Sequence, residues 1–384
     1  MKKQQTLFLA IVSCFWFAQY VYIPYQTPFL TSLGISSSMI GIIVGAYGIS
    51  QMLLRLPVGV LADQAGRHKH FILTGCLCSG IASIFRIFLP NAIGFLIANL
   101  FSGMASAMWI SFMVFFTNSY PKDKQAQATG KIVLFNNLGM FLGFIISTLC
   151  YSHLGMKYLC IFSILGGGFA FLLGLFIKEE RPEKNNLSAK YLLSICSNKR
   201  LWMFAFIALI QQGIQMSTTM SFTTQILKDC GASNGMVGLS SMYYMLTAVC
   251  FAAFASSKFC AKKGPKFWIP TVLLCICCYC IFVPRITWIP GIFLLQTLPG
   301  MATGILFSYA TSEAMAEVPA EQKSTAMGFF QAFYAIGMTL LPILTGNIAS
   351  SIHMQTAYLF LAFIALAGFI MVKVFYKNKR NKLI

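Results

Sequence analysis

Long apolar segments alternate with short polar ones along the whole chain. A run of roughly 20 apolar residues is long enough to cross a bilayer as a helix. Twelve such runs predict twelve transmembrane helices, over 6–31, 38–62, 70–90, 93–117, 129–152, 157–178, 201–227, 236–257, 267–285, 288–312, 324–349 and 356–376. The one sustained charged run begins at Lys178, after the sixth. We therefore predict an all-α polytopic membrane protein with an N-terminal six-helix bundle (1–178), a linker (179–200) and a C-terminal six-helix bundle (201–384).

The two predicted bundles resemble each other in sequence. Gly34–Gly41 recurs as Gly231–Gly238, and Gly103–Ser106 recurs as Gly300–Thr303, so both matches have nearly the same offset (34 to 231, 103 to 300). Two like halves with a binding site at their interface are typical of secondary transporters. The repeat predicts a pseudo-symmetric pair of bundles with a central site.

Composition agrees with a membrane protein and indicates its orientation. The chain is 58% hydrophobic and 10% charged, with a formal net charge of +19. If the N-terminus is cytoplasmic, the loops alternate so that lysine and arginine gather on the cytoplasmic side, as the positive-inside rule requires. The basic residues then indicate the orientation of the chain in a bacterial plasma membrane, with both termini and the linker cytoplasmic. This explains the positive charge without a nucleic-acid partner, which is excluded.

Thirteen cysteines lie mostly inside the predicted spans, which is not a secreted disulfide framework. The one cluster, Cys275 to Cys280, spreads around its helix instead of sharing a face, so packing is the preferred interpretation over a soft-metal site. We expect no metal and no cofactor.

The loop between the second and third spans carries the most specific motif. Residues 59–69 read Gly-Val-Leu-Ala-Asp-Gln-Ala-Gly-Arg-His-Lys. This resembles the G-x-L-A-D-x-x-G-R-x-K signature of the major facilitator superfamily, in the loop where that family has it. The second half carries a degraded copy over 257–264, with Ala261 at the acidic position.

The resemblance implies a fold of twelve helices that works by alternating access, with this loop as a cytoplasmic gate. The loop would lock against the start of the eleventh helix, and the acids that end the tenth helix are candidates to pair with its arginine. The predicted gate residues are Gly59, Asp63, Gly66, Arg67, Glu313 and Glu317. A turn that only sets topology is the alternative.

The resemblance also implies that helices 1, 4, 7 and 10 surround the central cavity. In this sequence they carry polar and aromatic residues at helical spacing: Trp16, Gln19, Tyr22, Gln26, Asn99, Ser102, Ser106, Trp109, Gln211, Gln215, Thr218, Gln296 and Thr303. Amides inside hydrocarbon need partners or water, so the four stripes predict a wetted cavity for a neutral or amphipathic organic solute. The alternative is that each residue only holds helices together.

The sequence indicates less clearly which residues could couple transport to an energy source. All nine acids fall at or beyond a predicted membrane boundary, so no mid-membrane carboxylate can carry a proton; Glu313 is the best protonation candidate. Asn99 stands where proton-coupled exporters of the family commonly have arginine. Two arginines fall within predicted spans. Arg55 could extend toward the interface, make a structural pair or bind an anionic substrate, and Arg86 is expected to extend to the outer interface.

We therefore predict a monomeric transporter, and not an enzyme, that moves a small organic solute. The absence of a convergent catalytic set argues against an enzyme. The short loops and length resemble bacterial efflux members, which favours export by proton-driven antiport, with H⁺ as the coupling ion and membrane lipid as surroundings. The alternatives are an importer or uniporter of a sugar-like or anionic nutrient, with Arg55 as its charge partner, and a lipid scramblase.

Overall fold

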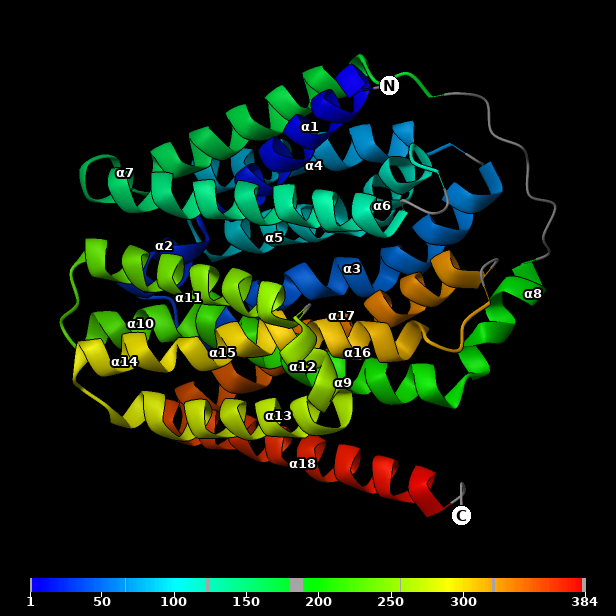
Figure 1. The fold of residues 1–384 in the computed structure, drawn as a ribbon. Helices are drawn as coiled ribbons and strands as arrows, with labels where there is room; N and C mark the ends of the chain where they lie inside the picture. The colour runs from blue at the N-terminus through cyan, green and yellow to red at the C-terminus, as the bar shows by residue number, and fades with distance from the viewer. Residues whose placement is uncertain are drawn as a thin grey trace.

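The computed structural model describes residues 2–65, 67–121, 125–179, 189–255, 257–319 and 322–381. Within these ranges every element of regular secondary structure is a helix (Figure 1). Ten of the helices are long and apolar enough to cross a membrane, and a further bent pair, Lys190–Ser197 with Lys199–Asp229, also passes that test. The predicted all-α polytopic class is confirmed.

One of the ten helices accounts for two predicted spans. Helix α7 (Gln125–Leu175) contains a 48-residue apolar stretch, which would be about 72 Å long if straight, against a hydrocarbon core of about 30 Å. Gly155 breaks it with φ 73° and ψ −175°, a backbone conformation that glycine adopts readily. The chain turns back there (Figure 1). With the bent pair counted as one span, the structure has the twelve predicted crossings.

The helices follow the predicted spans closely. The first half contains α1 (Lys2–Tyr20), α2 (Ile23–Ser32), α3 (Ser37–Ala65), α4 (Lys69–Phe88), α5 (Ala92–Ala107), α6 (Trp109–Asn118) and α7. The second half contains α8 (Ala189–Leu193), η2 (Ser194–Ser197), α9 (Lys199–Ser217), η3 (Thr218–Phe222), α10 (Thr223–Asp229), α11 (Asn234–Ala255), α12 (Lys258–Lys263), α13 (Pro265–Phe282), η4 (Val283–Arg285), α14 (Ile289–Leu295), α15 (Thr297–Met301), η5 (Ala302–Leu306), α16 (Phe307–Met315), α17 (Lys323–Ser351) and α18 (Met354–Asn381).

Both chain termini and α8 lie at the same end of the molecule (Figure 1). We call this the terminal end, and we call the opposite end, where α2 meets α3 and α10 meets α11, the far end. An even number of crossings requires the two termini to be on one side. The bundle boundaries at 178 and 201 stay a prediction, because the linker residues 180–188 lie outside the described residues.

The sequence repeat builds the same contact in both halves. In the first half the Tyr47 hydroxyl lies 2.7 Å from the Ser106 hydroxyl, which joins α3 to α5. In the second half the Tyr244 hydroxyl lies 2.8 Å from the Thr303 hydroxyl, which joins α11 to η5. Both residues of the pair recur at one offset (47 to 244, 106 to 303). The duplication is therefore visible in side-chain bonding as well as in helix order.

Glycines let the two halves approach closely near the far end. A Cβ atom on Gly41 of α3 would lie 2.3 Å from the carbonyl oxygen of Pro342 in α17. At the pseudo-symmetric position, a Cβ on Gly238 of α11 would lie 2.2 Å from the Thr148 hydroxyl of α7. Real Cβ contacts are never this short, so both helix pairs depend on the missing side chain. Such glycine contacts between backbones are a common means of packing membrane helices.

Hydrogen bonds between the halves also lie near the far end. The Tyr25 hydroxyl donates to the Asn234 carbonyl oxygen over 2.7 Å. The hydroxyls of Thr27 and Ser221 are 2.9 Å apart and fully buried. Together with the glycine contacts, these bonds close the far end in this conformation.

Candidate substrate cavity

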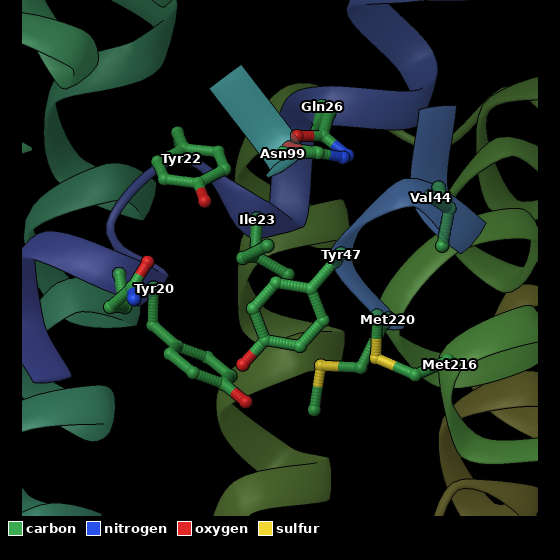
Figure 2. A pocket seen from close by; sticks show the side chains of 10 residues that line it. Tyr20, Tyr22, Ile23, Gln26, Val44, Tyr47, Asn99, Met216 and Met220 are labelled. Atoms are coloured by element: carbon green, nitrogen blue, oxygen red, sulfur yellow. The ribbon is translucent and has the colours of Figure 1, made fainter. Parts of the chain in front are cut away.

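A cavity lies between the halves at the centre of the molecule (Figure 2). It is lined by Gln19, Tyr20, Tyr22, Ile23, Gln26, Val44, Tyr47, Asn99, Met216 and Met220. These residues come from the junction of α1 with α2, from α3 and α5, and from α9 with η3. Figure 2 shows tyrosine rings and methionine side chains pointing into a common space.

Four of the thirteen predicted cavity residues line this space: Gln19, Tyr22, Gln26 and Asn99. The other nine do not: Trp16, Ser102, Ser106, Trp109, Gln211, Gln215, Thr218, Gln296 and Thr303. Sequence reasoning missed Tyr20, Ile23, Val44, Tyr47, Met216 and Met220. The second predicted span, which is α3 in the structure, was not counted among the cavity helices, so Val44 and Tyr47 were missed. Methionine in an apolar span is indistinguishable from an ordinary packing residue. One of the missed residues, Tyr47, had a signal in the sequence, because it recurs in the second half as Tyr244.

Two glutamines present unused hydrogen-bond acceptors at the cavity. Gln19 Nε2 donates to the carbonyl oxygen of Ser102 over 2.9 Å and to the Ser106 hydroxyl over 3.3 Å, which fixes its amide. Among the described residues the Oε1 atoms of Gln19 and Gln26 are buried without a partner. A buried acceptor without a partner is costly, so these atoms are positioned to accept from a bound molecule or a water.

The predicted cavity residues of the second half bond mostly to protein groups in this conformation. Gln211 Nε2 donates to Gln215 Oε1 over 2.9 Å, and the Thr303 hydroxyl lies 3.4 Å from the same oxygen. Gln296 Nε2 donates to the Ser240 hydroxyl over 3.2 Å. Thr218 donates to the Ile214 carbonyl of its own helix. Of these bonds, only those of Thr303 with Gln215 and of Gln296 with Ser240 join different helices. Gln211 Oε1 is buried without a partner among the described residues.

The two predicted tryptophans pack on each other beside the cavity. Trp16 and Trp109 meet edge to face with ring centroids 5.2 Å apart, and both are more than nine-tenths buried. The Trp16 Nε1 atom has no partner among the described residues. The Trp16 ring also lies 5.6 Å, centre to centre, from the ring of Tyr20, so the two tryptophans extend the aromatic wall of the cavity.

Each of the four helices expected to surround the cavity is interrupted in mid-span. The first breaks between α1 and α2, and the fourth between α5 and α6 at Met108. The seventh and tenth contain π-helical turns, η3 and η5. π-Helical turns are frequent at functional sites, and broken helices at membrane depth are tolerated where they line a cavity. The interruptions mark the same central layer in both halves.

The expected gate pairs are not present in this conformation. Arg200 takes both carboxylates: its Nη2 lies 2.7 Å from Glu313 Oε2 and its Nη1 lies 2.7 Å from Glu317 Oε1. The planar guanidinium of Arg200 can bind both carboxylates because they are one helical turn apart. Arg67, the expected partner, is exposed in its loop. A Cβ on Gly59 would have its nearest contact at 4.0 Å, on Ile110. Gly66 and the Asp63 side chain lie outside the described residues.

The 59–69 loop is instead anchored to its own half. The Glu179 carboxylate accepts from the backbone N–H groups of His68 and Lys69, over 2.6 and 3.2 Å, at the start of α4. A carboxylate is favoured at a helix N-terminus because it faces the unpaired N–H groups and the positive end of the helix dipole. Lys69 Nζ donates to the carbonyl oxygens of Leu175 and Ile177. Sequence reasoning placed Glu179 in the linker and missed this role.

The two intramembrane arginines are both buried. Arg86 is 2% exposed, so the expectation that it reaches the interface is wrong: its Nη2 donates to Asn99 Oδ1 and to Ser102 Oγ, over 2.8 and 3.1 Å. Arg55 is 4% exposed and crosses between the halves, where it donates to the Tyr334 hydroxyl of α17. Polar side chains within reach hold both guanidinium groups inside the protein.

Relatives by sequence are transporters. An uncharacterized MFS-type transporter of Methanocaldococcus jannaschii is 25% identical over 362 residues, which cover 88% of this chain and 89% of the relative. The uncharacterized MFS-type transporter YfkF of Bacillus subtilis is 37% identical over 86 residues, 21% of this chain and 22% of its own length.

Solved structures show the same fold at low sequence identity. The nucleoside transporter NupG superposes with a TM-score of 0.75 at 16% identity, covering 97% of this chain and 99% of that one. A bacterial homologue of the human lysosomal transporter Spinster, in an inward-facing and occupied conformation, gives a TM-score of 0.72 at 14% identity, over 96% and 94% of the two chains. The sequence profile of the Major Facilitator Superfamily matches residues 8–292 and 205–383. This chain is therefore a multi-pass membrane transporter that belongs to the Major Facilitator Superfamily.

Proposed function

We propose that this transporter carries a small organic solute by alternating access, with the solute bound in the central cavity. The observation that carries the proposal is a cavity between two pseudo-symmetric halves, with unused acceptors on Gln19 and Gln26 and an end closed by contacts between the halves. A site that opens to one side at a time needs this arrangement. The gate at residues 59–69 would act at the terminal end when the halves reverse.

The positive-inside bias supports an orientation in which the terminal end, the linker 179–200 and both chain ends are cytoplasmic. In that orientation the structure is closed toward the outside. The bundle boundaries 1–178 and 201–384 belong to the same proposal, because the rocking units are the two halves. The membrane would be the bacterial plasma membrane.

Export by proton-driven antiport is supported by the resemblance to efflux members, and Glu313 is its protonation candidate. Glu313 lies at the terminal end, bonded to Arg200 and to the Tyr376 hydroxyl. Import or uniport of an anionic nutrient is the second candidate, supported by the buried guanidinium of Arg55 between the halves. Transport assays in proteoliposomes, with a solute first identified by a binding screen, distinguish the two candidates. Antiport should fall severalfold when an uncoupler removes the proton gradient, whereas uniport should not change.

Removing the unused acceptors should weaken binding of that solute. Gln19→Ala and Gln26→Ala each delete a buried amide at the cavity, and one lost hydrogen bond to a ligand corresponds to about a 3- to 15-fold weaker Kd. The readout is the ligand-dependent rise in melting temperature of purified protein. Gln355→Ala, an exposed glutamine near the far end, is the matched control and should bind normally. Unchanged binding in both cavity variants would refute the site.

A further inference from the structure

Among the described residues, two buried arginines in the membrane-embedded part have no carboxylate partner, Arg55 and Arg86. The described acids have other partners: Glu179 binds the start of α4, Asp229 accepts from Gln225, and Glu313 and Glu317 bind Arg200. Asp63, whose side chain lies outside the described residues, is eight positions from Arg55, about 12 Å along a helix. Neither Arg55 nor Arg86 is among the partners of the described acids.

Arg86 is surrounded by neutral groups. Its guanidinium donates to the Ser83 hydroxyl over 3.0 Å as well as to Asn99 and Ser102, and its Cζ lies 3.7 Å from the ring centre of Tyr22. Its Nε has no partner among the described residues. Hydrogen bonds and a π face lessen the cost of burying the ion, but they leave its charge in place.

Arg55, between α3 and α17, is also surrounded by neutral groups. It meets the Tyr334 hydroxyl and, over 3.5 Å, the Gln331 carbonyl oxygen, and its Cζ lies 5.0 Å from the Tyr334 ring centre. Its Nε also lacks a partner among the described residues. A buried cation without a counter-charge is expensive in a membrane, and such residues commonly mark a substrate path.

Arg86 lies directly behind the cavity wall, and Arg55 lies farther along one of the lining helices. Tyr22 and Asn99 line it, and both contact Arg86 directly. Tyr47 lines it from α3, about two helical turns before Arg55 on the same helix. At low dielectric the field of both guanidinium groups extends into this space. A cationic ligand would be repelled there, and an anionic ligand would be attracted.

We propose that the central site takes an amphipathic organic anion, in the simplest case a small carboxylate whose body also carries an N–H or O–H donor for the Oε1 atom of Gln19 or Gln26; this rests on the cavity being the transport site. The negative group would lie on the side of Asn99 and Tyr22, where Arg86 is the balancing charge. The apolar part would lie against Tyr20, Met216 and Met220, whose rings and thioethers suit an aromatic or aliphatic body. The substrate class follows from the charge that the protein itself leaves unbalanced.

Matched ligands test the charge directly. Purified full-length protein in detergent is titrated with indole-3-acetate, indole-3-acetamide and tryptamine, which all keep the indole N–H donor, and its thermal unfolding is followed. We expect the carboxylate to stabilise the protein with an apparent Kd about 10- to 100-fold lower than that of the amide, since the buried guanidinium groups attract a negative charge at low dielectric, and the amine to have no effect.

One substitution supplies an internal counter-charge. Asn99→Asp places a carboxylate where Arg86 already donates at 2.8 Å. The variant should unfold at a higher temperature than the wild type without ligand, and the carboxylate should no longer stabilise it. Arg86→Lys keeps the charge and should retain part of the preference for carboxylates. Arg285→Gln removes an exposed arginine near the far end and should behave as the wild type.

The results separate this inference from the proposed function. A wild-type protein that no carboxylate stabilises, or an Asn99→Asp variant that still prefers carboxylates, would overturn the anion assignment. Stabilisation by an amide or amine alone, lost in Gln26→Ala, would overturn it while supporting the cavity as the binding site. Stabilisation by carboxylates that survives Gln19→Ala, Gln26→Ala and Asn99→Asp would place the ligand elsewhere and refute both.

Discussion

Replacing Gly238 by valine is expected to abolish most transport while the protein remains folded. A Cβ at this position would lie 2.2 Å from the Thr148 hydroxyl oxygen and 2.5 Å from the Tyr25 hydroxyl oxygen. Both neighbours belong to the other half, so the clash opposes closure of the far end more than the folding of either half. Overpacking costs about 1–3 kcal/mol, which shifts the balance between conformations by about 5- to 150-fold.

The test compares Gly238→Val with Gly168→Val in proteoliposomes. A Cβ on Gly168, in α7, would meet nothing within 4 Å, so this control should transport normally. Hydrogen–deuterium exchange adds a structural readout: segments 34–48 and 231–241 at the far end should exchange faster in Gly238→Val only. Normal transport by Gly238→Val would mean that closure of the far end is not required.

Replacing Arg200 by alanine should cause the largest loss of stability of any single charge removal in the described part of the chain. Its guanidinium also donates through Nε to the Glu313 carbonyl oxygen over 2.8 Å, so three bonds tie α9 to the end of α16. The Tyr376 hydroxyl donates to Glu313 Oε2 and brings in α18. Without Arg200, the Glu313 carboxylate, 16% exposed, would keep its charge without a counter-ion.

Breaking a buried pair costs about 3–5 kcal/mol, and partial exposure reduces this to about 2–3 kcal/mol here. We expect the melting temperature of Arg200→Ala to fall by several degrees, and that of Arg200→Lys to fall less, since lysine keeps the charge without the fork. Lys199→Ala removes an exposed neighbouring cation and is the control. An equal fall in melting temperature for the Lys199 and Arg200 variants would show that the bonds of Arg200 to Glu313 and Glu317 contribute nothing specific.

Much of the architecture could be predicted because membrane helices obey local rules. Apolar length and loop charge depend on the residues of each segment alone, so twelve spans could be found without any contact information. The repeat pairs, such as Tyr47 with Tyr244, follow from duplication and appear in the structure as equivalent hydrogen bonds. Even the Gly155 turn falls between two predicted spans.

The partners of polar side chains could not be predicted, because helical periodicity gives the face of a residue and not what lies opposite it. Gln19 and Gln215 have the same pattern in sequence, yet one lines the cavity and the other accepts bonds from Gln211 and Thr303. Glu313 was assigned to Arg67, but its carboxylate pairs with Arg200 of α9.

The sequence by itself determined that this protein crosses a membrane twelve times, in two related halves, because hydrophobic length, charge placement and duplication are written in consecutive residues. Only the tertiary structure decided where the cavity lies, which end is closed and which charges are balanced. Those properties arise from contacts between helices far apart in the chain. Arg86 is the clearest case: its position near the end of a span suggested the interface, but Tyr22, between α1 and α2, and Asn99 of α5 hold it inside the protein.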